Sequence, residues 1–229
     1  TPPCVMAPDS AMLEMGLAGW STYKAGSLRE HDLNLGATEL RYGIAPQLEM
    51  ELSWAGLTFR SIHEGGTPLR QRATDVGDIS IGALYGLMGK DGPVAIQGFV
   101  TLPTGSGAAT GGTWSGGVRL PMAASFGGNW QFGVTPEFDL AANGSGHGRH
   151  SAYGGAAGIS RPLSDTLSGG LDISLFHDED PEESSTQSIT TASVAWQADS
   201  NTQFDIGAGL GLTHSSPRAQ FYIGFARRL

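Results

Sequence analysis

The sequence contains no long apolar run, and this absence excludes a transmembrane helix. Such a helix needs about 20 consecutive, mostly apolar residues, whereas the apolar residues of this 229-residue chain are spread in short segments. Cysteine is nearly absent as well. The single Cys4 cannot form an intramolecular disulfide, so covalent cross-links within the chain do not contribute to its stability.

Charge is also scarce. Charged residues make up 15% of the chain, below the roughly one quarter usual for globular proteins. The net charge of −9 disfavours nucleic acid as a partner, because phosphates would be repelled. Glycine is abundant, at 35 residues, but it has no three-residue period, which excludes a collagen-like chain. Low charge, many glycines and short apolar segments together are typical of a membrane β-barrel.

The pattern that is present is a strict alternation of apolar residues with small or polar ones. It runs in segments of about ten residues, which is the signature of transmembrane β-strands. Clear segments cover residues 47–54, 78–87, 94–102, 131–140, 170–175, 203–212 and 220–225, and weaker ones start near Met12, Leu33, Trp114, Ala152 and Ser188. We therefore predict an all-β fold: an up-and-down antiparallel transmembrane barrel of about 12 strands, an even number as bacterial barrels have.

The connections between these segments alternate in length. Short ones, with the Gly, Pro, Asn and Asp of tight turns, lie at 45–46, 89–92, 127–129, 164–165 and 198–201. Long ones lie at 24–31, 61–76, 103–113, 143–150 and 178–187. Short periplasmic turns and longer extracellular loops are the arrangement of the bacterial outer membrane, which is the location we predict.

Aromatic residues near the predicted strand ends agree with an interfacial girdle, the alternative being ordinary core aromatics of a soluble barrel. They are Trp54, Tyr85, Trp114, Phe126, Trp130 and Trp196. Pro136 conflicts with its predicted strand, because proline removes a donor from the ladder; a bulge there would resolve the conflict.

We divide the chain into a periplasmic N-terminal segment, residues 1–11, and a transmembrane barrel, residues 12–229. Cys4 is then an incidental periplasmic thiol, with lipidation or intermolecular pairing as alternatives. A second possibility is that the N-terminal segment, or a long loop, folds inward and plugs the lumen.

Four motifs in order extend over nearly the whole chain. They are ELRYGI at 39–44 with Leu48 and Glu49, GDISIG at 77–82, LPTG at 102–105, and the closing run 212–228 that contains Ser216-Pro217. In this order they resemble the outer-membrane family of the MetA-pathway of phenol degradation. The resemblance implies an outer-membrane barrel that helps small, often aromatic, compounds across.

Parity assigns charged residues to the lumen. If Leu48, Met50 and Leu52 face lipid, Glu49 and Glu51 face inward, and an Arg or Lys on the lipid face would cost about 2–4 kcal/mol at the midplane. The predicted solute path consists of Glu14, Glu39, Arg41, Glu49, Glu51, Asp78, Arg119, Glu137, Asp139, Asp172 and Asp205, with Arg228 on the same face.

Two interpretations of this acid-rich set remain open. Surplus negative potential would favour cations or neutral polar solutes, whereas a ladder of carboxylates around Arg41 would only brace neighbouring strands. We expect bracing from Glu39, Glu49, Glu51 and Asp78, and selectivity from Glu137, Asp139, Asp172 and Asp205, which have no base nearby in the sequence. Small inward residues are expected to leave open space: Gly154, Ala156, Gly158, Gly170, Gly207, Gly209 and Gly211.

Other chemistry finds little support. The group His147, His150 and Ser151 matches no nucleophile motif, so we expect no enzymatic activity. The acidic run 178–183 has oxygens for calcium but no EF-hand spacing, and a solvated loop is the expectation; we predict no metal and no cofactor.

The sequence thus predicts a passive channel or facilitator for small, hydrophobic or aromatic molecules through an acidic lumen. The alternative is a structural or interaction barrel with a plugged lumen in an outer-membrane assembly. The expected partners are outer-membrane lipid, lipopolysaccharide and the solute, and the sequence does not identify whether a protein partner exists.

Overall fold

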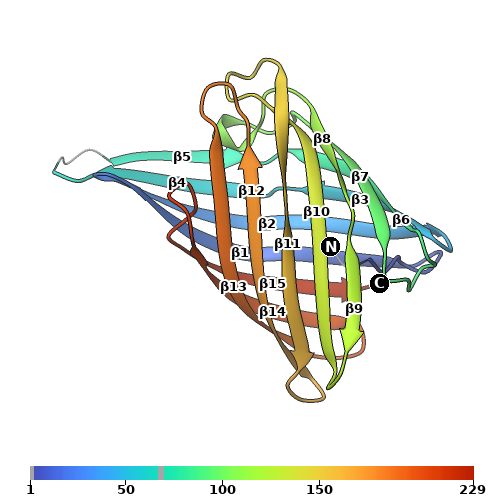
Figure 1. Cartoon of the computed structure of the whole chain (residues 1–229). Coiled ribbons are helices and arrows are strands. Elements are labelled where there is room, and N and C mark those ends of the chain that lie inside the picture. The colour runs from blue at the N-terminus through green and yellow to red at the C-terminus, as the bar shows by residue number, and fades with distance from the viewer. Residues whose placement is uncertain (1–2, 67–69) are drawn as a thin grey trace.

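The computed structural model describes residues 3–66 and 70–229 as a closed antiparallel β-barrel (Figure 1). Its strands are β1 (Ala11–Ala25), β2 (Leu28–Ala45), β3 (Leu48–Trp54), β4 (Leu57–Glu64), β5 (Arg70–Val76), β6 (Ile79–Gly86), β7 (Ala95–Leu102), β8 (Ser115–Arg119), β9 (Met122–Phe126), β10 (Trp130–Ala142), β11 (Arg149–Pro162), β12 (Leu167–Asp178), β13 (Ser185–Gln197), β14 (Thr202–Gly211) and β15 (Ala219–Arg228). A short 3-10 turn, η1 (Gly107–Ala109), lies in the β7–β8 loop. Within the described ranges, no helix has the length and apolar character needed to cross a membrane.

Three long strands are each interrupted once. The first interrupted strand consists of β3 and β4, which both pair with β2. The second consists of β5, which pairs with β4, and β6, which pairs with β3. The third consists of β8 and β9, which both pair with β10. Counting each interrupted strand once gives twelve strands around the barrel. β1 pairs with both β2 and β15, which closes the sheet and leaves no free first or last strand. The predicted fold class and strand number are confirmed.

The two ends of the barrel differ in most of their connections. Short turns lie at 46–47, 127–129, 163–166 and 198–201, at the end where β1 begins and β15 ends. The fifth predicted short turn, 89–92, belongs to a connection of eight residues at the same end, 87–94, so its predicted length is wrong. Longer loops at 103–114, 143–148 and 179–184 lie at the other end.

Two of the predicted long loops are strands instead. The region 24–31 holds only a two-residue turn, because β1 extends to Ala25 and β2 begins at Leu28, and most of 61–76 belongs to β4 and β5, apart from 67–69, which lie outside the described residues. These strands form the long hairpins that project at the left of Figure 1. Their polar residues pair across strands: Arg60 lies 2.9 Å from Glu30 and 3.2 Å from Asp32. Such pairs favour strand pairing, whereas the sequence reading assigned these polar residues to loops.

Pro136 lies in β10 without a bulge, which corrects the predicted resolution of its conflict. The register with β11 is continuous, Pro136 being opposite Gly155. The neighbouring strand on the other side breaks instead: Leu120 and Pro121 separate β8 from β9 beside Pro136. The proline therefore lacks its donor where the adjacent ladder is already interrupted.

Burial in this protein is the inverse of burial in a soluble one. Glu49 and Arg41 are almost fully buried, while Leu52 is 50% and Ile206 57% exposed. Apolar side chains outward and polar ones inward are the arrangement of a barrel that lies in lipid. The described residues contain one buried apolar cluster, formed by Val5, Leu84 and Ala95.

Candidate functional site

Arg41 on β2 is the centre of the first polar network of the lumen. Its guanidinium is 2.7 Å from the Glu49 carboxylate on β3 and 3.2 Å from Glu14 on β1. It also donates to the carbonyl of Cys4, at 3.0 Å, while the backbone N–H of Met6 donates to Glu49 at 2.5 Å. The network, which we call the Arg41 cluster, thus ties three strands to the N-terminal segment.

A second network crosses the wall from β3 to β10. Gln97 on β7 donates to Glu51, and Arg119 on β8 donates to Gln97 at 3.5 Å and to Glu137 at 2.7 Å. The guanidinium of Arg119 also lies 4.4 Å from the centre of the Phe99 ring. Glu137 therefore does have a basic partner, because the strand register places it directly opposite Arg119. The prediction that Glu137 lacks a nearby base is wrong.

Asp78 holds a loop. It lies between β5 and β6, and its carboxylate accepts hydrogen bonds from the backbone N–H groups of Gly105, at 2.7 Å, and Gly111, at 3.1 Å. Both belong to the β7–β8 loop. Asp78 is buried, so this contact fixes the loop against the barrel rather than exposing charge to a path. Asp78 therefore does not pair with Arg41 as expected. Glu39, another residue of the expected ladder, accepts a hydrogen bond from Ser53 instead.

Three predicted lumen carboxylates have no basic partner. Among residues 3–66 and 70–229, no ion pair reaches Asp139, Asp172 or Asp205. Asp139 has one buried oxygen without a hydrogen bond. The absence of an ion pair at these three positions agrees with the expectation that they have no nearby base, and their role in selectivity stays a prediction.

The lumen contains a cavity of about 810 Å³ beside β1, β2, β14 and β15. That volume falls within the ~300–1,000 Å³ of small-molecule sites. Its lining includes Glu14, Glu39, Arg41, Gln203, Asp205 and Tyr222. A smaller space of about 350 Å³ lies near β10–β13 and includes Asp172 and Gly158. The structure thus brings Glu14, Glu39, Arg41 and Asp205 to one cavity and places Asp172 in another.

Small inward residues serve partly to seat neighbouring side chains. A Cβ on Gly207 would lie 2.2 Å from the Tyr222 ring, and one on Gly158 would lie 1.9 Å from the Asp172 carboxylate. The glycines therefore let larger side chains lie flat against the wall. The predicted solute path contained charged residues only, so it missed the uncharged lumen residues Tyr222, Gln203 and Gln97. Their alternation with apolar neighbours in the sequence could have identified them.

The N-terminal segment lies in the short-turn end of the barrel. Val5 is buried against Leu84, and its backbone N–H donates to the carbonyl of Lys90 at 2.8 Å. A Cβ on Gly43 would lie 2.1 Å from the carbonyl oxygen of Ala7, so the absence of a side chain at Gly43 allows the segment to approach β2. Residues 4–7 line a space of about 500 Å³ that also includes Arg41. The segment therefore narrows the lumen at this end.

The closed barrel, the sorted connections and the inverted burial define the class: this is an outer-membrane β-barrel protein. The chain belongs to the family described as "Putative MetA-pathway of phenol degradation", whose model matches residues 18–229. The family resemblance predicted from the four motifs is confirmed. No curated protein matches the sequence.

Solved structures of similar fold are outer-membrane barrels. The COG4313 outer membrane channel from Pseudomonas putida F1 is 14% identical with a TM-score of 0.76, covering 98% of this chain and 97% of that one. The β domain of the Bordetella autotransporter BrkA is 11% identical with a TM-score of 0.67, covering 97% and 100%. The CymD monoaromatic hydrocarbon channel is 7% identical with a TM-score of 0.54, covering 96% and 88%. Because these sequence identities are low, the structural similarity shows a shared fold and nothing more.

Proposed function

We propose that this protein is a passive, non-enzymatic channel for small molecules, and that neutral or cationic solutes, including aromatic ones, pass through its acidic lumen. The observation that carries the proposal is the cavity of about 810 Å³ on the inner wall. An engineered cavity of only ~150 Å³ accommodates benzene, so a small aromatic molecule has ample room. Two similar folds are named as channels, one of them for monoaromatic hydrocarbons, which supports the same function.

The charge of this cavity supports the selectivity part of the proposal. The cavity is bordered by three acidic residues, Glu14, Glu39 and Asp205. Two basic residues, Arg41 and Arg228, also belong to its lining. Arg41 already pairs with Glu49 and Glu14. The remaining negative charge favours cations over anions along the wall.

A second candidate function rests on the N-terminal segment. The contacts of Val5, Met6 and Cys4 with the wall narrow the short-turn end. A barrel closed there would act as a structural or interaction protein, with outer-membrane lipid and lipopolysaccharide as its surroundings.

Planar-bilayer conductance and liposome swelling separate the two functions. We expect wild-type protein to conduct with cation preference and to pass phenol as a neutral aromatic probe. Asp205→Asn together with Glu39→Gln, which borders the same cavity and has no ion pair among the described residues, should lower the cation preference while the barrel stays folded.

Gly43→Ala tests the N-terminal segment, because the added methyl group would displace Ala7 from β2 and widen the path. Gly98→Ala is the matched control, since no atom lies within 4 Å of its added Cβ. Absence of both conductance and swelling in wild type and in Gly43→Ala would overturn the channel and favour the structural barrel.

A further inference from the structure

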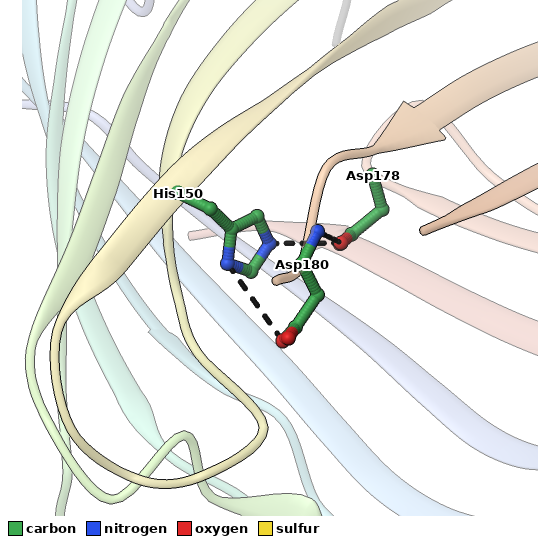
Figure 2. Close-up of side chains that lie close together, drawn as sticks. All are labelled: His150, Asp178 and Asp180. Atoms are coloured by element: carbon green, nitrogen blue, oxygen red, sulfur yellow. Dashed lines mark hydrogen bonds and ion pairs between the residues drawn. The ribbon is translucent and has the colours of Figure 1, made fainter. Parts of the chain in front are cut away.

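The outer mouth of the barrel contains a compact group of three ligand-type side chains. His150 lies on β11, Asp178 ends β12, and Asp180 lies in the β12–β13 loop (Figure 2). One candidate ligand atom from each residue lies within 4.8 Å of the others, and within 3–66 and 70–229 this is the one such group. Alternation places His150 with Ala152, and Asp178 with Asp172, on the inward faces of their strands. The group therefore lies on the lumen side of the rim.

His150 is buried beside two carboxylates, and one of its ring nitrogens has no hydrogen bond. Its side chain is 6% exposed, yet its Nε2 atom has no hydrogen bond. The other ring nitrogen, Nδ1, lies 2.9 Å from the Asn143 side-chain oxygen, which can only accept. With Nδ1 beside Asn143, Nε2 is the ring nitrogen that has no hydrogen bond.

The Nε2 atom lies beside a carboxylate. Asp178 Oδ1 is 2.8 Å away, but its direction from the ring does not satisfy hydrogen-bond geometry. Two ligands of one tetrahedral Zn²⁺, each at about 2.1 Å, lie about 3.4 Å apart, so this pair has to open slightly to hold an ion between its atoms.

Asp180 is the third member of the group, and its Oδ2 atom lies 3.8 Å from Nδ1, the ring nitrogen away from Asp178 (Figure 2). An ion bound at Nε2 therefore requires a small shift of the loop that holds Asp180. Its two oxygens accept backbone hydrogen bonds from Glu182, at 2.8 Å, and Gly144, at 2.6 Å. These two N–H donors fix the orientation of the Asp180 carboxylate. The Gly144 contact also joins the β10–β11 loop to the β12–β13 loop.

We propose that His150, Asp178 and Asp180 form a binding site for a divalent first-row transition cation, Zn²⁺ above all, which links two extracellular loops at the mouth. One imidazole nitrogen with two carboxylates suits Zn²⁺, whereas Ca²⁺ and Mg²⁺ prefer oxygen ligands alone. Asn143 is a positioning residue that orients the imidazole, as the outer-shell partners of metal-binding histidines do. This site is independent of what passes through the lumen.

The test measures Zn²⁺ binding to the full barrel in detergent, purified without a histidine tag, by competition with a chromogenic chelator. We expect one Zn²⁺ per chain and no competition from excess Ca²⁺ or Mg²⁺. His150→Gln and Asp180→Asn should each weaken Zn²⁺ binding at least about tenfold, and Asn143→Ala should weaken it by roughly 10–100-fold. His214→Gln, which alters an exposed histidine of the β14–β15 loop, is the matched control.

Hydrogen exchange supplies a readout that does not depend on affinity. Added Zn²⁺ should protect residues 143–148 and 179–184 in wild type and His214→Gln but not in Asp180→Asn. If His150→Gln fails to fold, Asp180→Asn alone tests the site. Asp180 and its two backbone donors, Gly144 and Glu182, lie in loops, so this substitution leaves the strands of the barrel unchanged. No stoichiometric binding, or an equal loss in His214→Gln, would overturn the site, as would loops whose order depends on pH but not on Zn²⁺.

Discussion

Arg41 illustrates, at the scale of a single residue, how this barrel tolerates charge in its interior. The Arg41 side chain is 3% exposed and its partner Glu49 is fully buried, 2.7 Å away. A buried pair contributes little net stability, but removing one partner leaves the other charge uncompensated, at a cost of about 3–5 kcal/mol. The Arg41 cluster is therefore sensitive to single substitutions and tolerant of paired ones.

We expect Arg41→Met to lower the free energy of unfolding by about 3–5 kcal/mol, because Glu49 would stay buried and unpaired. Arg41→Met with Glu49→Leu should recover most of this loss. Urea unfolding of the barrel in lipid vesicles, followed by tryptophan fluorescence, gives both values. A double variant as unstable as the single one would contradict the argument.

Gly207 and Tyr222 form a second interdependent pair. A methyl group on Gly207 would meet the Tyr222 ring, and the ring borders the cavity. We expect Gly207→Ala to push the ring into the cavity and lower single-channel conductance, with a change in stability below about 1 kcal/mol. Gly207→Ala with Tyr222→Ala should restore conductance, and Gly98→Ala should leave it at the wild-type level. Unchanged conductance in Gly207→Ala would show that the ring does not border the path.

Parity in the sequence predicted which residues face inward, and it could do so because strand side chains alternate strictly. Glu49 and Glu51 are buried while Leu52 is exposed, as predicted. Partners across strands could not be predicted in the same way. Glu137 pairs with Arg119 only because β10 and β8 are aligned at that position, and strand register depends on every turn between them.

At the scale of elements, the β7–β8 loop depends on one side chain. Asp78 accepts two backbone hydrogen bonds from this loop, and a hydrogen bond to a charged group such as this carboxylate contributes about 1.5–3 kcal/mol. We expect Asp78→Ala to increase hydrogen exchange at residues 104–112 by freeing both donors. Exchange in β10–β15 should stay as in wild type. Equal loosening of those strands would mean that Asp78 supports the whole barrel instead.

The β13–β14 turn predicts a pH dependence. The backbone N–H of Asn201 donates to Asp199 at 2.8 Å and, with contacts to Thr202, lowers the pKa of that carboxyl. Because the folded pKa lies below the unfolded value, the stabilisation is fully present above about pH 3.9. It is lost as pH falls through the lowered folded pKa.

Asp199→Asn removes the charge but keeps an acceptor. Wild type should therefore have a higher midpoint of thermal unfolding than Asp199→Asn at pH 7, and the difference should shrink as pH falls below the ordinary aspartate pKa. Asp165→Asn in the β11–β12 turn is the control. A difference that grows on acidification would reverse the assigned sign.

The projecting hairpins contain strands that the hydrophobic pattern of the sequence does not reveal. Residues 28–32 and 60–64 have polar and charged side chains on both faces, so no hydrophobic alternation marks them. They remain strands because β2 pairs with β1 on one side and β4 on the other. Ladder pairing and ion pairs such as Arg60 with Asp32 decide the structure beyond the membrane, where the sequence pattern carries no signal.

For the whole molecule, the solvent differs on the two faces of one wall, and this difference explains why the fold was predictable and the path was not. Lipid demands an apolar outer face along every strand, and that demand repeats in the sequence. The lumen only has to satisfy polar groups, which Gln97, Asp78 and the N-terminal segment do in three different ways. The contacts inside the lumen therefore differ from residue to residue, whereas the apolar pattern of the outer face is the same in every strand.

β14 allows this asymmetry to be tested with one substitution on each face. Ile206 lies mid-strand and is 57% exposed toward lipid, while Gln203 borders the cavity. We expect Ile206→Arg to lower the free energy of unfolding in vesicles by about 2–4 kcal/mol, the cost of an arginine near the bilayer midplane. Gln203→Arg adds the same side chain to a polar wall near Asp205, so it should leave stability nearly unchanged and reduce cation preference. An equal loss of stability in both variants would contradict a lumen that accepts charge.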